Sequence, residues 1–219
     1  MKPLIVFSGI DSAGKSTQID LLRKHYLTNI IRHKVIWSRG GYTTGFETIK
    51  NIMRFFFRKK LPDPGRNKNR QEMFDKKSVS KIWYLFAMLD LIRLYAITFR
   101  IYRFFGVTII ADRYLWDTYV DYKMSLKNIN LEKSILWKLA VFLSPKTDKS
   151  ILLFVSPEVS FQRSIDKSEP HFDSLEVRKS RIEIYTKLAS NHKWNLTLNT
   201  EISDVNMTFS SIKECIYGI

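Results

Sequence analysis

The stretch that decides the fold is LIVFSGIDSAGKST, Leu4–Thr17. It opens with apolar residues typical of a buried strand, and Gly9–Ser16 then matches the phosphate-binding pattern G-x-x-x-x-G-K-[ST]. The glycines let backbone N–H groups turn towards phosphate oxygens, and the helix that follows adds the positive end of its dipole. Lys15 can reach the β- and γ-phosphates of a nucleotide. A glycine turn that only joins a strand to a helix is the alternative.

The same pattern predicts ATP and Mg²⁺ as cofactors, because the Ser16 hydroxyl can bind the metal. The nucleotide contacts are expected from Gly9, Ser12, Ala13, Gly14, Lys15, Ser16 and Thr17. A second magnesium ligand is expected at the end of another buried strand. Val107–Ala111 is such a segment, and Asp112 follows it directly. Asp112 is therefore the second metal candidate, although an aspartate at this place could instead cap the next helix.

Strand-like and helical segments alternate along the whole chain. Strands are predicted at residues 4–8, 34–37, 107–111, 150–155 and 196–198, with helices at 16–27, 48–59, 71–102, 117–125, 131–143, 158–165, 175–190 and 202–217. Such alternation predicts a parallel sheet covered by helices on both faces. Together with the phosphate motif it gives an α/β fold of the P-loop NTPase type, a three-layer sandwich, with residues 1–219 as a single domain.

Composition narrows the class of protein. Of the 219 residues, 45% are hydrophobic and 26% are charged, which is typical of a globular chain. The single cysteine, Cys215, excludes an internal disulfide and favours the cytoplasm. The first apolar run is too short for a signal peptide. The apolar stretch Ile82–Ile110 contains Asp90 and several arginines, which argue against a transmembrane helix.

The charge is strongly positive. There are 36 Lys and Arg against 21 Asp and Glu, a net charge of +15. Between Gly45 and Arg103 there are 14 basic and 5 acidic residues. This basic region could bind an anionic membrane surface, which would place the protein at the inner face of the membrane, or it could be a solvated helix face. No nucleic-acid recognition motif accompanies the charge, so no specific nucleic acid is predicted.

Four segments of the chain resemble the thymidylate kinase family. They are FSGIDSAGKSTQ (Phe7–Gln18), ADRYLWDTYVDY (Ala111–Tyr122), DKSILLFVSPEVSFQRSID (Asp148–Asp166) and FDSLEVRKSRIEIYTKLA (Phe172–Ala189). The resemblance implies a P-loop nucleoside monophosphate kinase that converts dTMP to dTDP, with a small-molecule phosphate acceptor as its partner. It also implies a small lid near residues 164–175, and a homodimer, since related kinases often form one.

The resemblance also implies roles for individual residues. Asp11 would bind a sugar hydroxyl of the acceptor, and Arg113 would hold the acceptor phosphate. Arg39 falls where the family has another acceptor-side arginine. Arg163 and Lys167 approach the lid, although each could be a solvated surface residue. A guanidinium suits phosphate because it binds two oxygens at once. The implied catalytic group is Lys15, Arg113, Asp11 and Arg163.

Several positions depart from the family pattern. The Arg-Glu-Pro-Gly loop is replaced by SRGGYT, Ser38–Thr43, and Asp90 stands near an expected arginine, with Arg93 three residues on. After Asp-Arg-Tyr come Asp117 and Asp121, which share one face of a helix. These two carboxylates could contact the acceptor, or accept the proton of a sugar hydroxyl, or serve as a cap and a solvated face.

Three functions therefore remain open at this point. The first is phosphorylation of a nucleoside monophosphate, dTMP above all. The second is phosphorylation of a non-nucleotide acceptor, such as a sugar or a lipid-linked intermediate of surface polysaccharide synthesis. The third is a nucleotide-binding scaffold without catalysis. The departures lie where the family recognises its base, so the sequence does not choose the acceptor.

Overall fold

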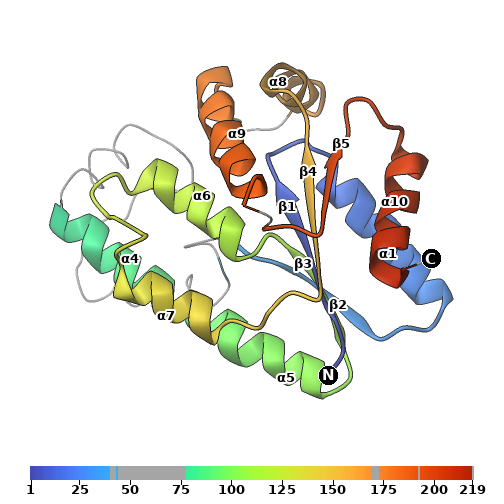
Figure 1. Ribbon diagram of the computed structural model, residues 1–219, viewed down its shortest axis with the longest axis horizontal. Coiled ribbons are helices and arrows are strands. Elements are labelled where there is room, and N and C mark those ends of the chain that lie inside the picture. Colours follow the sequence, from blue (N-terminus) through green and yellow to red (C-terminus); the bar gives the residue numbers. More distant parts are fainter. Residues whose placement is uncertain (40–42, 44–76, 169–172, 192, 219) are drawn as a thin grey trace. The chain divides into compact units, whose positions relative to one another are not determined.

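The computed structural model describes residues 1–39, 43, 77–168, 173–191 and 193–218 (Figure 1). These residues form two compact units. The sheet unit comprises Met1–Trp37, Tyr102–Val120 and Lys146–Ile219, and the helical unit comprises Ser38–Ile101 and Asp121–Pro145. The expected single domain over residues 1–219 stays a prediction. The predicted helix 48–59 and most of the basic region lie outside the described residues.

The sheet unit is built on five parallel strands. They are β1 (Leu4–Gly9), β2 (His33–Trp37), β3 (Thr108–Asp112), β4 (Lys149–Phe154) and β5 (Leu196–Asn199), in the order β2-β3-β1-β4-β5. β1 pairs with β3 and β4, and every residue of β1 is buried. A strand buried on both faces is read as a continuous apolar run, which is why LIVF identified it. The predicted parallel α/β sheet is confirmed.

Helices flank this sheet (Figure 1). α1 (Lys15–Thr28) contacts β1, β2 and β3, while α10 (Val205–Tyr217) contacts α1, β4 and β5, so these two helices cover one face together. α8 (Pro157–Asp166) packs against α9 (Leu175–Ala189), and Figure 1 shows α9 on the other side of the sheet.

Each helix after the fourth strand begins at a side-chain cap. Ser156, Ser174 and Asp204 accept hydrogen bonds from the first-turn N–H groups of α8, α9 and α10. The sequence predicted that α10 starts at Ile202. The cap is Asp204 and the first helical residue is Val205, so the predicted start lies three residues before the helix.

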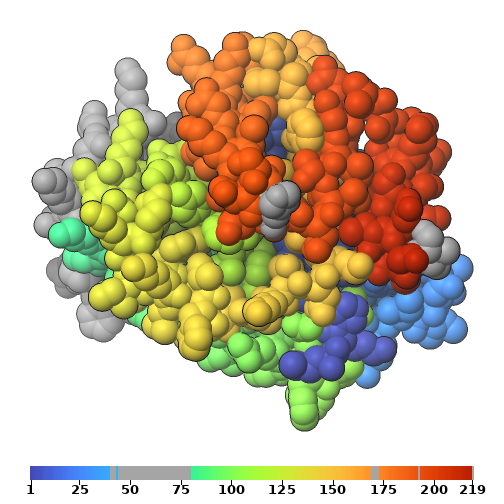
Figure 2. Space-filling model, in the orientation of Figure 1, coloured from blue at the N-terminus to red at the C-terminus, as the bar shows by residue number. Residues whose placement is uncertain are grey.

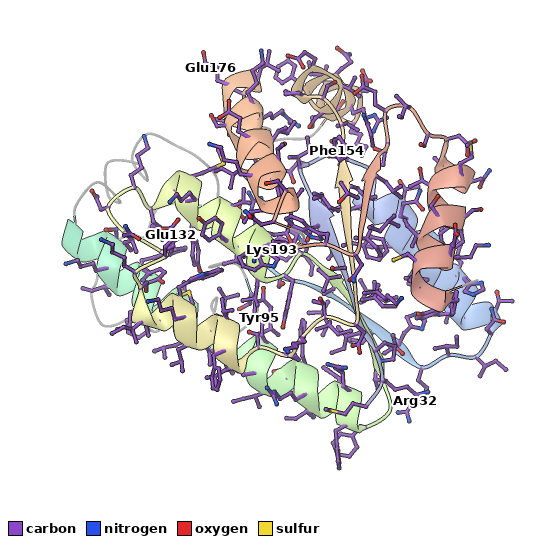
Figure 3. The ribbon with its side chains drawn as sticks, in the orientation of Figure 1. Arg32, Tyr95, Glu132, Phe154, Glu176 and Lys193 are labelled. Carbon is purple, nitrogen blue, oxygen red and sulfur yellow. The ribbon has the colours of Figure 1, made fainter. Side chains whose placement is uncertain are left out.

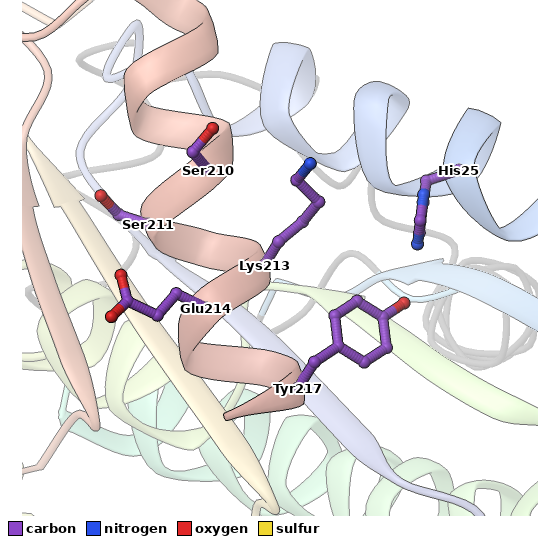
Figure 4. A pocket seen from close by; sticks show the side chains of 6 residues that line it. All are labelled: His25, Ser210, Ser211, Lys213, Glu214 and Tyr217. Carbon is purple, nitrogen blue, oxygen red and sulfur yellow. The ribbon is translucent and has the colours of Figure 1, made fainter. Parts of the chain in front are cut away.

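An open hollow of about 590 Å³ lies between α1 and α10 (Figure 4). Its lining consists of His25, Ser210, Ser211, Lys213, Glu214 and Tyr217. The His25 ring lies edge-on to Tyr217, with 5.7 Å between the ring centroids. These side chains belong to the two covering helices, so the hollow is a surface feature of α1 and α10 and is separate from the glycine loop after β1.

The helical unit is organised around buried tyrosines. α4 (Lys77–Ile92) continues as a π-helix, η1 (Arg93–Thr98), and as α5 (Phe99–Phe104), which runs into the sheet unit. Tyr95 is fully buried, and its hydroxyl lies 2.9 Å from the Ser38 hydroxyl (Figure 3). Tyr84 lies 2.7 Å from the Ser134 hydroxyl, which also caps α7 (Ile135–Leu143). The sequence predicted one continuous helix over residues 71–102, whereas the structure has a π-helical segment within it.

One helical run in the described part of the chain, Ser80–Phe104, is long and apolar enough to cross a bilayer by length and composition. Of its most apolar window, 44% is buried inside the structure. A core helix has the same composition, and the buried side of this run carries Asp90 and the hydroxyl of Tyr95. One side of the helical run Ser80–Phe104 is therefore buried in the interior of the protein.

Candidate active site

The glycine-rich loop connects the end of β1 to the start of α1 in the sheet unit. Gly9 has φ +135°, and a Cβ atom placed there would lie 1.9 Å from the carbonyl oxygen of Leu153 on β4. Only glycine allows the two strands to approach this closely. Gly14 precedes the first residue of α1 with φ +86°, a left-handed conformation. The loop therefore leads from a strand into the N-terminus of a helix, as predicted.

Lys15, the first residue of α1, is buried under this loop. Its Nζ donates hydrogen bonds to the carbonyl oxygens of Gly9 at 3.0 Å and Ile10 at 2.5 Å. The pKa of Lys15 is lowered from 10.5 to about 8, chiefly by burial and then by the neighbouring Arg113 cation, while three aspartates oppose the shift. Because carbonyl groups are its partners, the ammonium group is available to a stronger anionic acceptor.

Arg113 joins the loop to the end of β3. It has φ +78°, an uncommon conformation for a bulky residue, which costs roughly 1–3 kcal/mol. Its backbone N–H donates to the Phe7 carbonyl at 2.8 Å, and its guanidinium donates to the Gly9 carbonyl at 3.1 Å and to the carboxylate of Asp11. The structure thus brings together Asp11 and Arg113, two residues predicted to contact the acceptor.

Asp117 lies below the loop and is 1% exposed. Its carboxylate accepts hydrogen bonds from four donors: the Ser8 hydroxyl at 2.6 Å, the Gly9 N–H at 3.1 Å, the Tyr114 N–H at 3.1 Å and the Tyr185 hydroxyl at 2.7 Å. A carboxylate has about four lone-pair sites, so protein donors fill its capacity. Asp117 connects β1, the turn after β3 and α9 to one another.

Asp112 is the last residue of β3, and it is suited to a metal ion. Its Oδ1 is buried without a hydrogen-bond partner among the described residues. Burial raises its pKa, while Lys15 and Arg113 lower it. Ser16 is exposed in the first turn of α1, as is Thr17. An unpartnered carboxylate oxygen and a hydroxyl are ligands that Mg²⁺ accepts.

No group of three or more His, Cys, Asp or Glu residues forms a metal site within the described ranges. This agrees with the way Mg²⁺ binds in phosphoryl-transfer sites, where one or two protein oxygens hold it together with substrate phosphates and water. The two oxygen donors present, Asp112 Oδ1 and the Ser16 hydroxyl, fit that kind of Mg²⁺ binding.

Arg163, on α8, binds the backbone of the glycine-rich loop. Its guanidinium donates to the carbonyl oxygens of Ser12 at 3.4 Å and Thr200 at 3.0 Å, and to the Thr200 hydroxyl at 3.3 Å. The Thr200 hydroxyl in turn donates to the Ala13 carbonyl at 3.0 Å. The sequence indicated Arg163 from the resemblance, but no signal pointed to Thr200. Lys167 is exposed at the end of α8, and residues 169–172 of the predicted lid lie outside the described part of the chain.

A buried arginine on α9 also reaches the loop through α8. Arg178 is 2% exposed and donates to the hydroxyls of Ser160 and Ser164, with 2.8 Å to the latter. The Ser160 hydroxyl donates to the Asp11 carbonyl at 2.7 Å, and the Ser164 hydroxyl lies 3.0 Å from that of Ser12. Sequence reasoning missed this connection, because two serines on a helix form no recognisable motif.

In the helical unit, two predicted acceptor contacts bind each other. The guanidinium of Arg39 donates twice to the carboxylate of Asp121, at 2.8 and 3.1 Å. Asp90 is buried, pairs with Arg93 at 2.8 Å and accepts a hydrogen bond from Thr43. The aspartate at the expected arginine position is therefore an internal partner of two neighbours.

Comparisons with known proteins concern the fold. No model of a known protein family matches the chain, and no curated protein matches it. Among solved structures, the thymidylate kinase of Ehrlichia chaffeensis is similar over 98% of this chain and 98% of its own, with a TM-score of 0.56 and 18% sequence identity. The chain therefore has the fold of a thymidylate kinase, a P-loop NTPase fold in which helices flank a parallel sheet.

Proposed function

We propose that the protein is a phosphotransferase that moves the γ-phosphoryl group of ATP to a small acceptor. The observation that carries the proposal is the meeting of Lys15, Arg113 and Asp112 at the carboxyl ends of β1 and β3. In open parallel sheets, ligands bind at this end of the strands. Two cations and a carboxylate whose Oδ1 has no hydrogen-bond partner among the described residues, all around a glycine loop, suit a magnesium nucleotide.

Several groups of the chain would bind the negatively charged phosphates of donor and acceptor. The loop N–H groups, the N-terminus of α1 and Lys15 would bind the donor phosphates. Ser16 and Asp112 would hold Mg²⁺, which when bound supplies positive charge against the phosphate oxygens. Arg113 would hold the acceptor and stabilise the negative charge that develops during transfer. The fixed contacts of Asp117 and Arg163 would keep the loop in shape.

For the acceptor, we propose a nucleoside monophosphate, with dTMP as the first candidate. Support comes from the likeness of the fold to a thymidylate kinase and from the Asp11–Arg113 pair, which offers both a carboxylate and a guanidinium. A monophosphate oxygen is already ionised at neutral pH, so the reaction needs no strong general base. That agrees with Asp117, whose hydrogen-bonding capacity is filled inside the protein.

A different acceptor, such as a sugar or a lipid-linked intermediate, is the second candidate. One observation favours it: Asp90 is buried and bound to Arg93 and Thr43. A carboxylate thus stands near the position where the family has an arginine for its nucleotide. If the acceptor is a hydroxyl, a base must accept its proton, and Asp11, which pairs with Arg113, is a partly exposed carboxylate that could do so.

The test is ADP release from Mg²⁺-ATP with dTMP, dUMP, the other nucleoside monophosphates and simple sugars as acceptors. Lys15→Ala is the inactive variant, and Lys24→Ala, an exposed lysine on the same helix, is its matched control. We expect turnover with one monophosphate above the others, a loss of about 100-fold or more in Lys15→Ala, and none in Lys24→Ala.

The outcomes separate the candidates. Selective turnover of dTMP supports a thymidylate kinase. ATP binding without turnover of any monophosphate excludes the first candidate, and turnover of a sugar then supports the second. Nucleotide binding without transfer to any acceptor, equal in wild type and Lys15→Ala, contradicts phosphoryl transfer and leaves the scaffold function. Transfer that needs no Mg²⁺ would instead contradict the metal role proposed for Ser16 and Asp112.

A further inference from the structure

The helical unit exposes apolar side chains on two helices that pack against each other. On α4 they are Ile82, Leu85 and Leu89, and on α7 they are Ile135, Leu139 and Phe142. Within each helix their spacing places them on one side. We call these six residues the apolar face. Ile135 and Phe142 are 81% and 82% exposed, and Figure 2 shows the α7 segment (yellow) at the visible surface.

The charges around the apolar face are mostly positive. Lys81 precedes Ile82, and Lys138 precedes Leu139; both are exposed, as are Lys127 and Lys133. None of these four lysines forms an ion pair within the described residues. The acidic residues described in this unit are Asp90, Asp121 and Glu132; the first two are buried, and Glu132 pairs with Lys123. The surface therefore offers cations beside apolar groups.

We propose that the apolar face binds the surface of an anionic lipid bilayer. Exposed aliphatic and aromatic side chains enter the boundary between headgroups and acyl chains, and the flanking lysines meet lipid phosphates. A second copy of this chain is a poorer occupant, because its lysines would be brought against the same lysines. The net charge of +15 makes that repulsion stronger.

The helices would lie in the plane of the membrane rather than cross it. The opposite side of α4 and η1 is committed to the protein interior, where Tyr84 binds Ser134 and Tyr95 binds Ser38. Crossing the bilayer would expose these polar groups and the buried carboxylate of Asp90 to hydrocarbon. Binding at the surface leaves them where they are.

The test is flotation of the full chain with vesicles of phosphatidylcholine alone or of an equimolar mixture with phosphatidylglycerol. The apolar variant is Ile135→Ser with Phe142→Ser, and its control is Ile30→Ser with Ile202→Ser, which are 91% and 83% exposed in the sheet unit. We expect binding to anionic vesicles that weakens with salt. We expect the apolar variant to partition about ten-fold less, equal to about 1.4 kcal/mol, and its control to match wild type.

A charge variant, Lys133→Glu with Lys138→Glu, should also lose about ten-fold, while Lys24→Glu with Lys187→Glu, elsewhere on the surface, should lose much less. Thermal unfolding checks that each variant folds, and Phe142→Ser alone replaces the double variant if that one does not.

Several results would overturn the proposal. One is equal binding by the apolar variant and its control, and another is no preference for anionic vesicles. A third is that the wild type sediments as a dimer and the apolar variant as a monomer, with no change in vesicle binding. That result would make a second copy of the chain the occupant of the apolar face. Because the readout is vesicle binding, failure of the kinase assay leaves this proposal intact, and the reverse also holds.

Discussion

Replacement of Asp117 by asparagine should destabilise the ligand-free protein more than most single polar substitutions. The aspartate receives four hydrogen bonds and is almost fully buried. Asparagine has the same shape, but only its carbonyl oxygen accepts, and its NH₂ group would face donors. The substitution therefore changes the hydrogen bonding under the glycine loop without creating a cavity.

The magnitude follows from the number of donors. The asparagine oxygen can keep two of the four donors, and its NH₂ group then faces one hydroxyl, which can turn to accept, and one backbone N–H, which loses its acceptor at roughly 1–3 kcal/mol. Arg113 also loses a carboxylate that lies 3.8 Å from its guanidinium. We expect a decrease of about 3 kcal/mol in the free energy of unfolding, a large part of the usual 5–15 kcal/mol.

Urea denaturation of the metal-free, nucleotide-free protein measures this difference. A cycle with Tyr185→Phe isolates one contact, the 2.7 Å hydrogen bond from the tyrosine hydroxyl to Asp117. Non-additivity of about 1 kcal/mol or more would show that the asparagine NH₂ group takes the place of Oδ1, whereas additivity would show that the asparagine oxygen still accepts from Tyr185. Asp117→Asn within about 0.5 kcal/mol of wild type would refute the role that the structure gives this carboxylate.

Three further predictions concern the loop itself. The folded-state pKa of Lys15, about 8, lies below the usual 10.5, so between these pH values the unfolded chain binds more protons than the folded one. The stability of the metal-free wild type relative to Lys15→Met should therefore rise by about 3 kcal/mol from pH 7.5 to 10.5. Equal dependence of the two unfolding free energies on pH would contradict this. Gly9→Ala should cost more than about 4 kcal/mol in urea denaturation because its Cβ meets the Leu153 carbonyl, whereas Gly218→Ala, with open space around it, should cost about 1 kcal/mol. Asp112→Asn should raise the Mg²⁺ concentration needed for half-maximal turnover at least about ten-fold, and an unchanged Mg²⁺ titration would remove Asp112 from the metal site.

Local sequence signals predicted the scaffold of the site well. The apolar run of β1, the glycine spacing and the position of Lys15 depend on neighbours in the chain, and the structure places all three as expected. The same holds for Asp112 at the end of β3, because strand burial and length can be judged from Thr108–Ala111 alone. Parallel pairing then follows from alternating strands and helices.

The partners of the charged residues could not be predicted in this way. Asp117 looked like a candidate for the acceptor, yet its donors come from residues up to 109 positions away. Arg39 and Asp121 were each expected to contact the acceptor, and the structure pairs them across 82 positions. Such contacts depend on how elements pack, and a single sequence contains no local pattern that reports them.

The cations of the sheet unit divide into two kinds by their oxygen partners. Lys15 is bound by two loop carbonyls, while Arg113 is bound by one carbonyl and the partly exposed Asp11 and lies 3.8 Å from the carboxylate of Asp117. Phosphate oxygens are stronger acceptors for a cation than carbonyls are, so an arriving nucleotide can replace the carbonyl partners of Lys15 without unfolding the loop. Arg163, by contrast, holds the carbonyls of Ser12 and Thr200, and therefore the loop backbone itself. Loss of Lys15 should thus abolish transfer in a protein that still folds, whereas loss of Arg163 should weaken nucleotide binding together with stability.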